Sequence, residues 1–430
     1  VKLAKRKWVA SITRDTKIEL LRRTSDKVWT DAANVKLNWT GLADTLTYPT
    51  IAIVDSGMTG LSTFGSRLQH GPSFTSGSPA SGANGHGTFV GSIAAGAEAN
   101  FTGSEPRARL LSVKVLDANG VGYKSDIIAA CDWILANRQA HNIRVANFSL
   151  NAGGESIRYD ALNKAVERLW LNGIVVVVAA GNYALGGAQS NVGFSPANDP
   201  FVITVGASDP KNTASRSDDG AAPWSAWGWT QDGFRKPEVA APGRYLVGAA
   251  PTGAKLLTDF ASRITAQTSG GSYLWMSGTS FAAPVVSGIA ASILAKNPSW
   301  TPDQVKGAIM QTATVPTGYT VGGALGVGVV NANAAVNASG TANPHLGLNS
   351  FTYWNGAAGR WEFNAESWRS HAASTPSWNA ASWSSASWSS ASWSSASWSS
   401  ASWSSASWSS ASWASASWAN ASWANGFDQE

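Results

Sequence analysis

The sequence predicts an α/β fold in which helices flank a doubly wound, mostly parallel sheet. Short apolar runs of strand length recur along residues 28–340, and segments with helical spacing of apolar residues lie between them. This alternation is typical of parallel sheets covered on both faces, because their buried strands read as continuous apolar runs. Ligands of such sheets bind at the carboxyl ends of the strands, where we therefore expect the functional residues.

The predicted elements alternate along the chain. Buried strands are predicted at 50–57, 109–117, 144–150, 173–182 and 201–208, each of them an apolar run. Helices are predicted at 84–96, 124–142, 157–172 and 279–295, and a further helix follows Thr301. The sequence Thr301-Pro302-Asp303 is typical of a helix start, because a capping hydroxyl precedes proline at the first helical position.

Composition divides the chain into a basic segment (1–27), a globular body (28–340), a connector (341–375) and a repeat (376–430). The 430 residues are 44% hydrophobic and 13% charged, with a formal net charge of +5. Residues 1–27 alone hold nine Lys or Arg and three acidic residues, so the rest of the chain is nearly neutral. Because no basic patch or nucleic-acid motif lies outside that segment, we expect no nucleic-acid partner.

Cys131 is the one cysteine of the chain, which excludes an intramolecular disulfide framework and a cysteine-rich metal site. It lies on the apolar face of the helix predicted at 124–142, so we expect a buried core thiol. No apolar run approaches the roughly 20 residues of a transmembrane helix. The sequence begins at Val1 rather than Met, which we interpret as a processed product or a fragment without its signal peptide.

Three short motifs place polar residues at strand ends or helix starts. Asp55 closes the strand at 50–57, His86 opens the helix in 84–96, and Ser280 lies in SGTSFAAP at the start of another helix. A serine nucleophile needs a base to accept its proton, and an imidazole base needs a carboxylate to fix its tautomer. A serine at a helix N-terminus also presents backbone N–H groups to a developing oxyanion. Each motif alone is weak, but together they indicate nucleophilic catalysis.

The segments IVDSG, HGTFVGSIAAG and SGTSFAAP resemble the three signature blocks of the subtilisin-like serine proteases, the subtilases of peptidase family S8. The resemblance covers residues 28–340 and implies a subtilisin-like fold. It implies that Asp55, His86 and Ser280 form a triad that hydrolyses peptide bonds through an acyl-enzyme. It also implies that Asn182, in VAAGN, donates its side-chain amide to the oxyanion; the alternative is a plain turn residue after a strand.

Substrate contacts follow from the same resemblance. Residues 147–154 resemble the strand that pairs with the substrate and forms one wall of the S1 pocket, and residues 117–126 resemble the opposing edge strand. Residues 194–200 resemble an S1 wall of small residues, so we expect broad specificity that favours apolar or aromatic P1 residues. The residues expected to contact substrate are Ser149, Leu150, Asn151, Gly120, Val121 and Gly122.

No cofactor is expected for the chemistry. Calcium is common in the family, but the loop before His86 has no recognisable calcium pattern, so a structural calcium site stays open and unassigned. Phe281 follows the nucleophile where the family often has Met, which removes an oxidation-sensitive thioether from this position.

Residues 8–20 alternate apolar and polar side chains, which indicates a strand rather than a loose tail. The same stretch resembles the last strand of subtilase prodomains, in which a Val-Ala-x-Val sequence precedes an Asp and leads into the cleavage site. We interpret residues 1–21 as a prodomain remnant, normally removed by self-cleavage near Leu20 and Leu21. A solvated basic tail and a nucleic-acid arm are the alternatives.

The repeat unit in 376–430 is Ala-Ser-Trp-Ser-Ser, with ten Trp spaced five residues apart. On a helix this period does not align the Trp side chains along one face, and on a strand it puts successive Trp on opposite faces. We therefore predict a β-like or extended tail. A disordered linker, a glycan- or cell-wall-binding strip, and burial against the body or neighbouring chains are the three interpretations. Burial is favoured, because ten buried aromatic side chains would dominate association into oligomers or filaments.

Taken together, these features predict a secreted serine endopeptidase that acts on proteins or peptides, with a tail that self-associates or anchors it at the cell surface. The alternative is a structural or assembly protein on a subtilase fold whose active site is occluded by the N-terminal segment. The presence of Asp55, His86, Ser280 and Asn182 favours the enzyme, because a purely structural role would not require all four.

Overall fold

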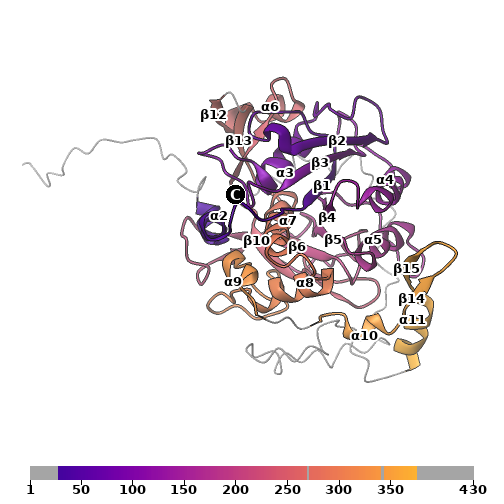
Figure 1. Ribbon diagram of the computed structural model, residues 1–430. Coiled ribbons are helices and arrows are strands. Elements are labelled where there is room, and N and C mark those ends of the chain that lie inside the picture. The colour runs from indigo at the N-terminus through magenta and orange to yellow at the C-terminus, as the bar shows by residue number, and fades with distance from the viewer. Residues whose placement is uncertain (1–27, 269–270, 340–342, 375–430) are drawn as a thin grey trace, which may run out of the picture.

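A central sheet organises the computed structural model, which describes residues 28–268, 271–339 and 343–374 (Figure 1). Its strands are β1 (Thr50–Asp55), β2 (Leu68–Ser73), β3 (Arg109–Lys114), β4 (Ile143–Phe148), β5 (Val175–Ala179), β6 (Ile203–Asp209), β7 (Gly220–Ala221) and β10 (Val239–Pro242). The order is β10-β6-β5-β4-β1-β3-β2, with all of these pairs parallel, and β7 pairs antiparallel with β6. The predicted α/β fold with a mostly parallel sheet and flanking helices is confirmed.

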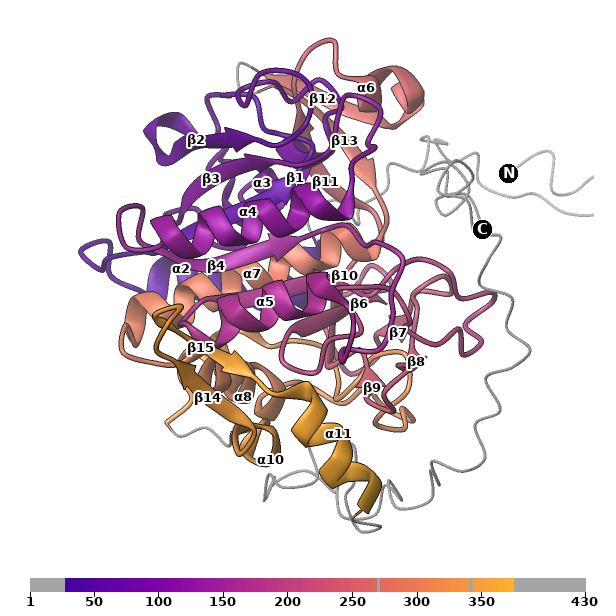
Figure 2. The same cartoon turned by 90° about the vertical axis from the view of Figure 1, so that its right-hand side faces the viewer.

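Helices cover both faces of this sheet (Figures 1 and 2). One face carries α4 (Lys124–Asn137) and α5 (Ala161–Leu171), and the other carries α3 (His86–Ala95) and α7 (Thr279–Lys296). The shorter helices α2 (Lys36–Gly41), α8 (Pro302–Gln311) and α9 (Ala332–Val336) complete the α7 side, and Ala33, directly after α1 (Val28–Ala32), accepts a hydrogen bond from the first N–H of α9. Cys131 on α4 is buried, as predicted.

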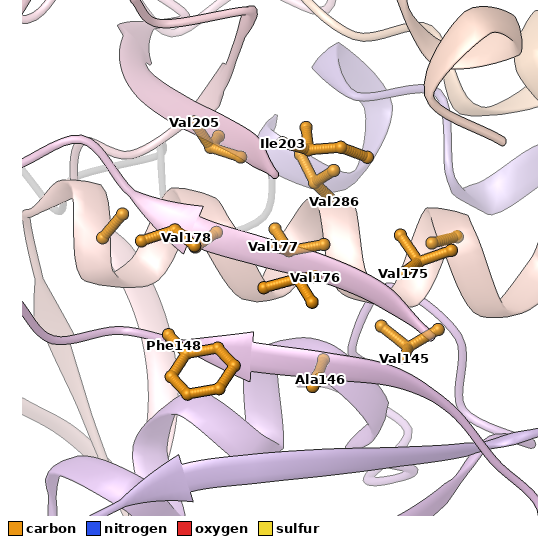
Figure 3. Packing of buried hydrophobic residues seen from close by; sticks show 14 of the residues in the cluster. Val145, Ala146, Phe148, Val175, Val176, Val177, Val178, Ile203, Val205 and Val286 are labelled. Atoms are coloured by element: carbon orange, nitrogen blue, oxygen red, sulfur yellow. The ribbon is translucent and has the colours of Figure 1, made fainter. Parts of the chain in front are cut away.

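Helix α7 packs across β4, β5 and β6 in the hydrophobic core. Figure 3 shows the valines of β5 between their neighbours on the adjacent strands and Val286 of α7. All five residues of β5 are buried, which explains its apolar sequence. Among the described residues, α7 alone is long and apolar enough to span a membrane, but it is 94% buried inside the protein as a core helix.

Element boundaries differ from the predicted ones for identifiable reasons. Helix α5 begins at Ala161 instead of residue 157, because the Asp160 side chain accepts hydrogen bonds from the N–H groups of Leu162 and Asn163. The start predicted after Thr301 is confirmed, since its hydroxyl accepts from Gln304 N and Pro302 is the first helical residue.

The protein also contains smaller antiparallel sheets outside the central sheet, which the sequence analysis did not predict. One sheet has the order β11 (Leu246–Ala250), β13 (Gly271–Met276), β12 (Ile264–Thr268), and a two-stranded unit joins β8 (Gly228–Trp229) to β9 (Arg235–Lys236). Helix α6 (Lys255–Asp259) and the single 3₁₀ turns η3 (Gly65–Arg67) and η4 (Ala261–Arg263) lie in the connections.

Residues 343–374 form a structured segment that packs back on the body below α5 (Figure 2). It consists of α10 (Leu346–Asn349), β14 (Thr352–Asn355), β15 (Arg360–Phe363) and α11 (Ala365–Ser374). Trp368 of α11 is fully buried and stacks on Phe234, with ring centroids 5.1 Å apart. We call residues 343–374 the C-terminal clasp; the sequence analysis described this region only as a connector.

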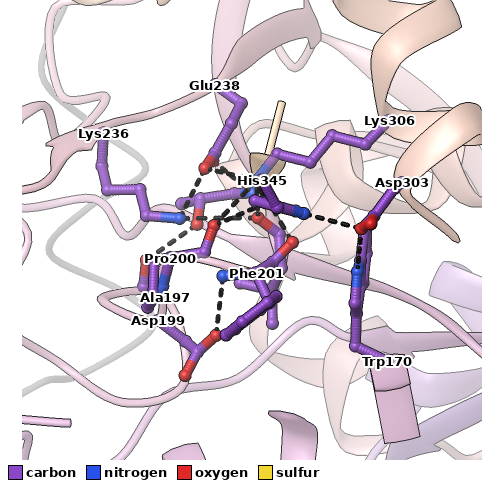
Figure 4. A network of polar contacts seen from close by, with 12 residues as sticks. Trp170, Ala197, Asp199, Pro200, Phe201, Lys236, Glu238, Asp303, Lys306 and His345 are labelled. Carbon is purple, nitrogen blue, oxygen red and sulfur yellow. Dashed lines mark hydrogen bonds and ion pairs between the residues drawn. The ribbon is translucent and has the colours of Figure 1, made fainter. Parts of the chain in front are cut away.

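Polar contacts also hold the clasp. His345 is buried, and its Nδ1 lies 2.7 Å from Asp303 Oδ1 of α8 while its Nε2 lies 3.1 Å from Lys306 Nζ (Figure 4). Lys306 also donates to Glu238 Oε1 at 2.9 Å. The predicted prodomain remnant and the Trp repeat lie outside the described residues.

Candidate active site

Asp55 lies at the carboxyl end of β1, a fully buried strand in the interior of the sheet. Its carboxylate is completely buried and accepts a hydrogen bond from the N–H of Ser56 to Oδ1 at 2.7 Å. The Nδ1 atom of His86 lies 2.8 Å from Oδ1 and 2.9 Å from Oδ2. A buried carboxylate in this position fixes the imidazole tautomer, because Nδ1 must carry the proton that faces it.

His86 is the first residue of α3, and glycines on both sides let it lie against β1. Gly85 has φ +96°, and a Cβ there would lie 2.9 Å from Leu256 Cβ. A Cβ on Gly87 would lie 2.5 Å from the Gly57 carbonyl oxygen and 3.2 Å from the Asp55 carboxylate. The close approach of Asp55 and His86 therefore requires glycine at these positions.

Ser280 is the second residue of α7, so its N–H belongs to the unbonded first turn of that helix. Its Oγ donates to the Ser149 carbonyl at 3.3 Å, and Ser149 Oγ donates to the Ser280 carbonyl at 2.6 Å. Phe281 packs against His86, with ring centroids 5.5 Å apart, and also against Phe89 of α3. These contacts bring the first turns of α3 and α7 together.

Asn182 follows β5, and its side chain reaches the start of α7. Its Oδ1 accepts hydrogen bonds from both the N–H and the Oγ1 of Thr279, each at 3.0 Å. Because a backbone N–H can meet only the oxygen of the amide, these bonds fix the orientation of the side chain. The Nδ2 donor is thereby left for a ligand beside Ser280, which is what an oxyanion-binding amide requires.

The predicted substrate-contact residues lie on two segments that follow β3 and β4. Ser149, Leu150 and Asn151 directly follow β4. No strand forms at Gly120, Val121 and Gly122, because Asp117 Oδ1 accepts from the N–H of residues 119 and 121 and closes a turn before α4. Their role in substrate binding stays a prediction.

The two segments expected to form the S1 walls are joined. Ala152 and Ser195 exchange backbone hydrogen bonds of 2.7 and 3.0 Å, which connects residues 147–154 to residues 194–200. A Cβ on Gly154 would lie 2.1 Å from the Gly193 carbonyl oxygen, so the backbones meet closely. Next to this junction the Tyr183 and Phe194 rings pack with centroids 4.8 Å apart.

Several supporting residues were missed by the sequence analysis. Thr279 holds Asn182, and Ser56 bonds to Asp55; both lie beside a motif residue, which was the available signal. Asn147 donates to Ser149 Oγ at 2.9 Å from within β4. Lys114 ends β3, whose sequence RLLSVK is mainly apolar in its middle, and it is buried.

Metal-binding clusters are not found in the part of the chain that the structure describes: no three His, Cys, Asp or Glu side chains there could jointly hold an ion. Calcium therefore has no assigned ligands, and none of the chemistry below depends on it.

Comparisons with known proteins assign the family. A sequence model described as the Subtilase family matches residues 48–347, which is most of the chain. The chain belongs to the subtilase family. The prediction of a subtilisin-like serine protease domain, made from the three motifs, is therefore confirmed.

Curated relatives agree with this assignment. This subtilase is 41% identical to serine protease AprX of Bacillus subtilis (strain 168) over 234 residues, which are 52% of this chain and 51% of that protein. It is 34% identical to subtilisin DY of Bacillus licheniformis over 268 residues, covering 61% of this chain and 83% of the relative. The chain thus spans about half the length of AprX. A solved cold-adapted subtilisin-like serine proteinase is 29% identical and covers 66% of this chain and 86% of its own, with a TM-score of 0.49.

Proposed function

We propose that this subtilase is a serine endopeptidase in which Ser280 is the nucleophile, His86 the general base and Asp55 the residue that orients the base. The observation that carries the proposal is the buried pair of Asp55 and His86, 2.8 Å apart, beside the helix turn that contains Ser280. A hydroxyl, an imidazole and a buried carboxylate in this order are the parts that acyl transfer requires.

The reaction proceeds in two halves. His86 Nε2 accepts the proton of Ser280 Oγ as the oxygen attacks the scissile carbonyl carbon, and the imidazolium then gives that proton to the leaving amine. The acyl-enzyme is hydrolysed by a water that His86 deprotonates in the same way. Asn182 Nδ2 and the Ser280 N–H donate to the oxyanion in both tetrahedral intermediates.

We propose broad specificity with a preference for apolar or aromatic P1 residues. The support is the composition of the segment at 194–200, which consists mainly of small and apolar residues, and its backbone connection to Ala152. The substrate backbone would lie extended between residues 120–122 and 149–151 and pair with both segments.

A fluorophosphonate probe tests the activity, because it reacts with a serine only where a working base and oxyanion site activate it. The intact chain should be labelled at Ser280, and Ser280→Ala and His86→Ala should abolish labelling and peptide hydrolysis. Ser367→Ala, which removes an exposed hydroxyl on α11, should leave both unchanged.

Two other results are informative. Labelling that requires removal of residues 1–27 would favour the occluded assembly protein over the active endopeptidase. A folded chain that is labelled neither before nor after this removal would contradict the proposed activity.

We propose that the Trp repeat at 376–430 mediates self-association or anchoring at the cell surface and that the enzyme is secreted. The support is the sequence itself, in which uncharged units present a Trp every five residues. Light scattering of the full chain and of a chain ending at residue 375 measures the contribution of the repeat. Equal, monomeric molar masses would contradict self-association, and binding to insoluble cell-wall polysaccharide would then favour anchoring.

A further inference from the structure

A buried lysine lies beside the proposed triad. Lys114 is the last residue of β3, and it is the register partner of Asp55 on β1. Its side chain is 2% exposed, and Nζ donates to the Ser56 carbonyl at 2.9 Å and to the Ser81 carbonyl at 3.4 Å. A lysine is almost never fully buried without partners, so its position needs an explanation.

Ser56, which accepts from Lys114, also contacts both Asp55 and the segment of His86. Its N–H donates to Asp55 Oδ1 at 2.7 Å, and its Oγ accepts from the N–H of Gly87 at 3.1 Å. One residue therefore connects the carboxylate, the helix that begins with His86, and the ammonium group. Movement of the Ser56 backbone would change the distance between Asp55 and His86.

Two carboxylates lie near the ammonium group and oppose the effect of its burial. Burial lowers the pKa of Lys114 below its usual value, and the carboxylates of Asp117 and Asp55 only partly offset this shift. The two carbonyl oxygens also act only as acceptors, which suits three N–H donors. Among the elements packed against His86, β11 and the first turns of α3 and α7 have no other Asp, Glu, Lys, Arg or His. Other charged groups on neighbouring elements are Arg109 at the far end of β3 and the exposed ion pair of Lys255 and Asp259 on α6, which bonds to the backbone of residues 83 and 84.

We propose that Lys114 is a positioning residue of the triad, which holds Ser56 against Asp55 and keeps a positive charge beside the Asp55–His86 pair. This inference rests on the proposed endopeptidase function. A cation beside the Asp55–His86 pair opposes a second positive charge there, so removing Lys114 should change the pH dependence of the reaction.

The pH dependence of kcat/KM tests the electrostatic part, because its acidic limb reports the titration of the base. Lys114→Met should move this limb to higher pH by about 0.5 to 1 unit and lower the maximal kcat about tenfold, with KM nearly unchanged. Lys114→Arg, which keeps the charge, should return the limb toward its original position. The number of active sites, counted with the fluorophosphonate probe, corrects for misfolded protein.

Asp117→Asn provides the opposite change. It removes a negative charge near Lys114 and keeps the side-chain oxygen that closes the turn, so the acidic limb should move to lower pH. Lys306→Met is the matched control, since Lys306 is equally buried but bonds to Glu238 and to backbone carbonyls elsewhere. It should leave the limb unchanged.

An unshifted limb in folded Lys114→Met would overturn the proposal. If Lys114→Met does not fold, Asp117→Asn decides alone, and a limb that stays in place or moves to higher pH would overturn it. A wild-type chain that neither hydrolyses peptides nor reacts with the probe would instead contradict the endopeptidase function itself, so the two failures are distinguishable.

Discussion

Single hydrogen bonds around Asn182 decide which atom it can offer to a substrate. Its Oδ1 is held by the N–H and hydroxyl of Thr279, so Nδ2 is the group left to bind an oxyanion. The Thr279 hydroxyl also accepts a hydrogen bond from the N–H of Gly181 at 3.0 Å, so Thr279 holds both Asn182 and the residue before it. The amide is therefore preorganised, and preorganised donors contribute more to the transition state than to substrate binding.

Asn182→Ala should lower kcat about 10²- to 10³-fold and leave KM nearly unchanged, because the Nδ2 donor acts on charge that develops in the transition state. Thr279→Val removes one of the two bonds to Oδ1 and should cost about tenfold. Steady-state hydrolysis of a chromogenic peptide measures both. Asn355→Ala on the β14–β15 hairpin is the control, and a large rise in KM at constant kcat would contradict the assigned role.

The residues proposed for catalysis were predictable from sequence, and their supports were not. Asp55, His86 and Ser280 each combine a reactive side chain with neighbouring glycines or small residues, so local sequence carries the signal. The bonds from Ser149 to Ser280 and from Thr279 to Asn182 join residues about 100 or more positions apart. Nothing in the local sequence specifies such contacts, because they depend on how the strands are ordered in the sheet.

At the scale of elements, burial on both faces determined what could be predicted. Strands β1 and β5 are buried at every position, and both were predicted from their apolar runs. Strand β2 (LQHGPS) lies at the sheet edge and is partly exposed, so its sequence shows neither an apolar run nor alternation. The sequence analysis predicted that α5 begins at residue 157, which is too early. The first residue of the helix is set by the Asp160 cap and not by the spacing of apolar residues.

The clasp was missed as an element, although its sequence contains a signal. Residues 352–363 read as two short strands around a glycine-containing turn, and Trp354, Trp361 and Trp368 are spaced seven residues apart. Of these three, Trp354 and Trp361 are exposed and Trp368 is buried, so composition alone did not reveal which of them packs on the body.

Trp368→Ala should lower the free energy of unfolding by about 3–5 kcal/mol, because it removes a fully buried ring that stacks on Phe234. Trp368→Phe should cost much less, since within the described part of the chain the indole N–H has no hydrogen-bond partner to lose. Urea unfolding in a Ser280→Ala background avoids self-digestion during the measurement. Exposed Trp354→Ala should change the value by less than about 0.5 kcal/mol, and a loss as large as that of Trp368→Ala would contradict the clasp contact.

At the scale of the whole molecule, buried charges join segments that are distant in sequence. Lys306 of α8 bonds to Glu238, to His345 of the clasp and to carbonyl oxygens before β6. Burial lowers the pKa of Lys306 to about 8, although Glu238 opposes this shift. Burial and the charge of Lys306 also lower the pKa of His345. The family match at 48–347 includes His345, so this network lies within the matched domain and attaches the first residues of the clasp to it.

Two buried carboxyl groups near this network make stability depend on pH. Burial raises the pKa of Asp199 to about 7, and burial together with Asp199 raises the pKa of Glu167 on α5 well above its usual range. The folded protein therefore keeps protons that the unfolded chain has released above about pH 4.5. Stability from these groups is fully present in acid and is lost as the pH rises through 7.

Replacing Glu167 by Gln removes one of these retained protons while keeping the size of the side chain. Relative to the parent, Glu167→Gln should therefore gain stability by up to about 1.4 kcal/mol per pH unit between pH 5 and 7, because the folded parent retains one more proton than the folded variant in that window. Urea unfolding of both chains in the Ser280→Ala background, at several pH values, measures this difference. Glu366→Gln, at an exposed position of α11, should show no such trend. A difference between Glu167→Gln and parent that is constant from pH 5 to 7 would mean that the pair is already ionised in the folded protein, and that Lys236 and Lys306 outweigh its burial.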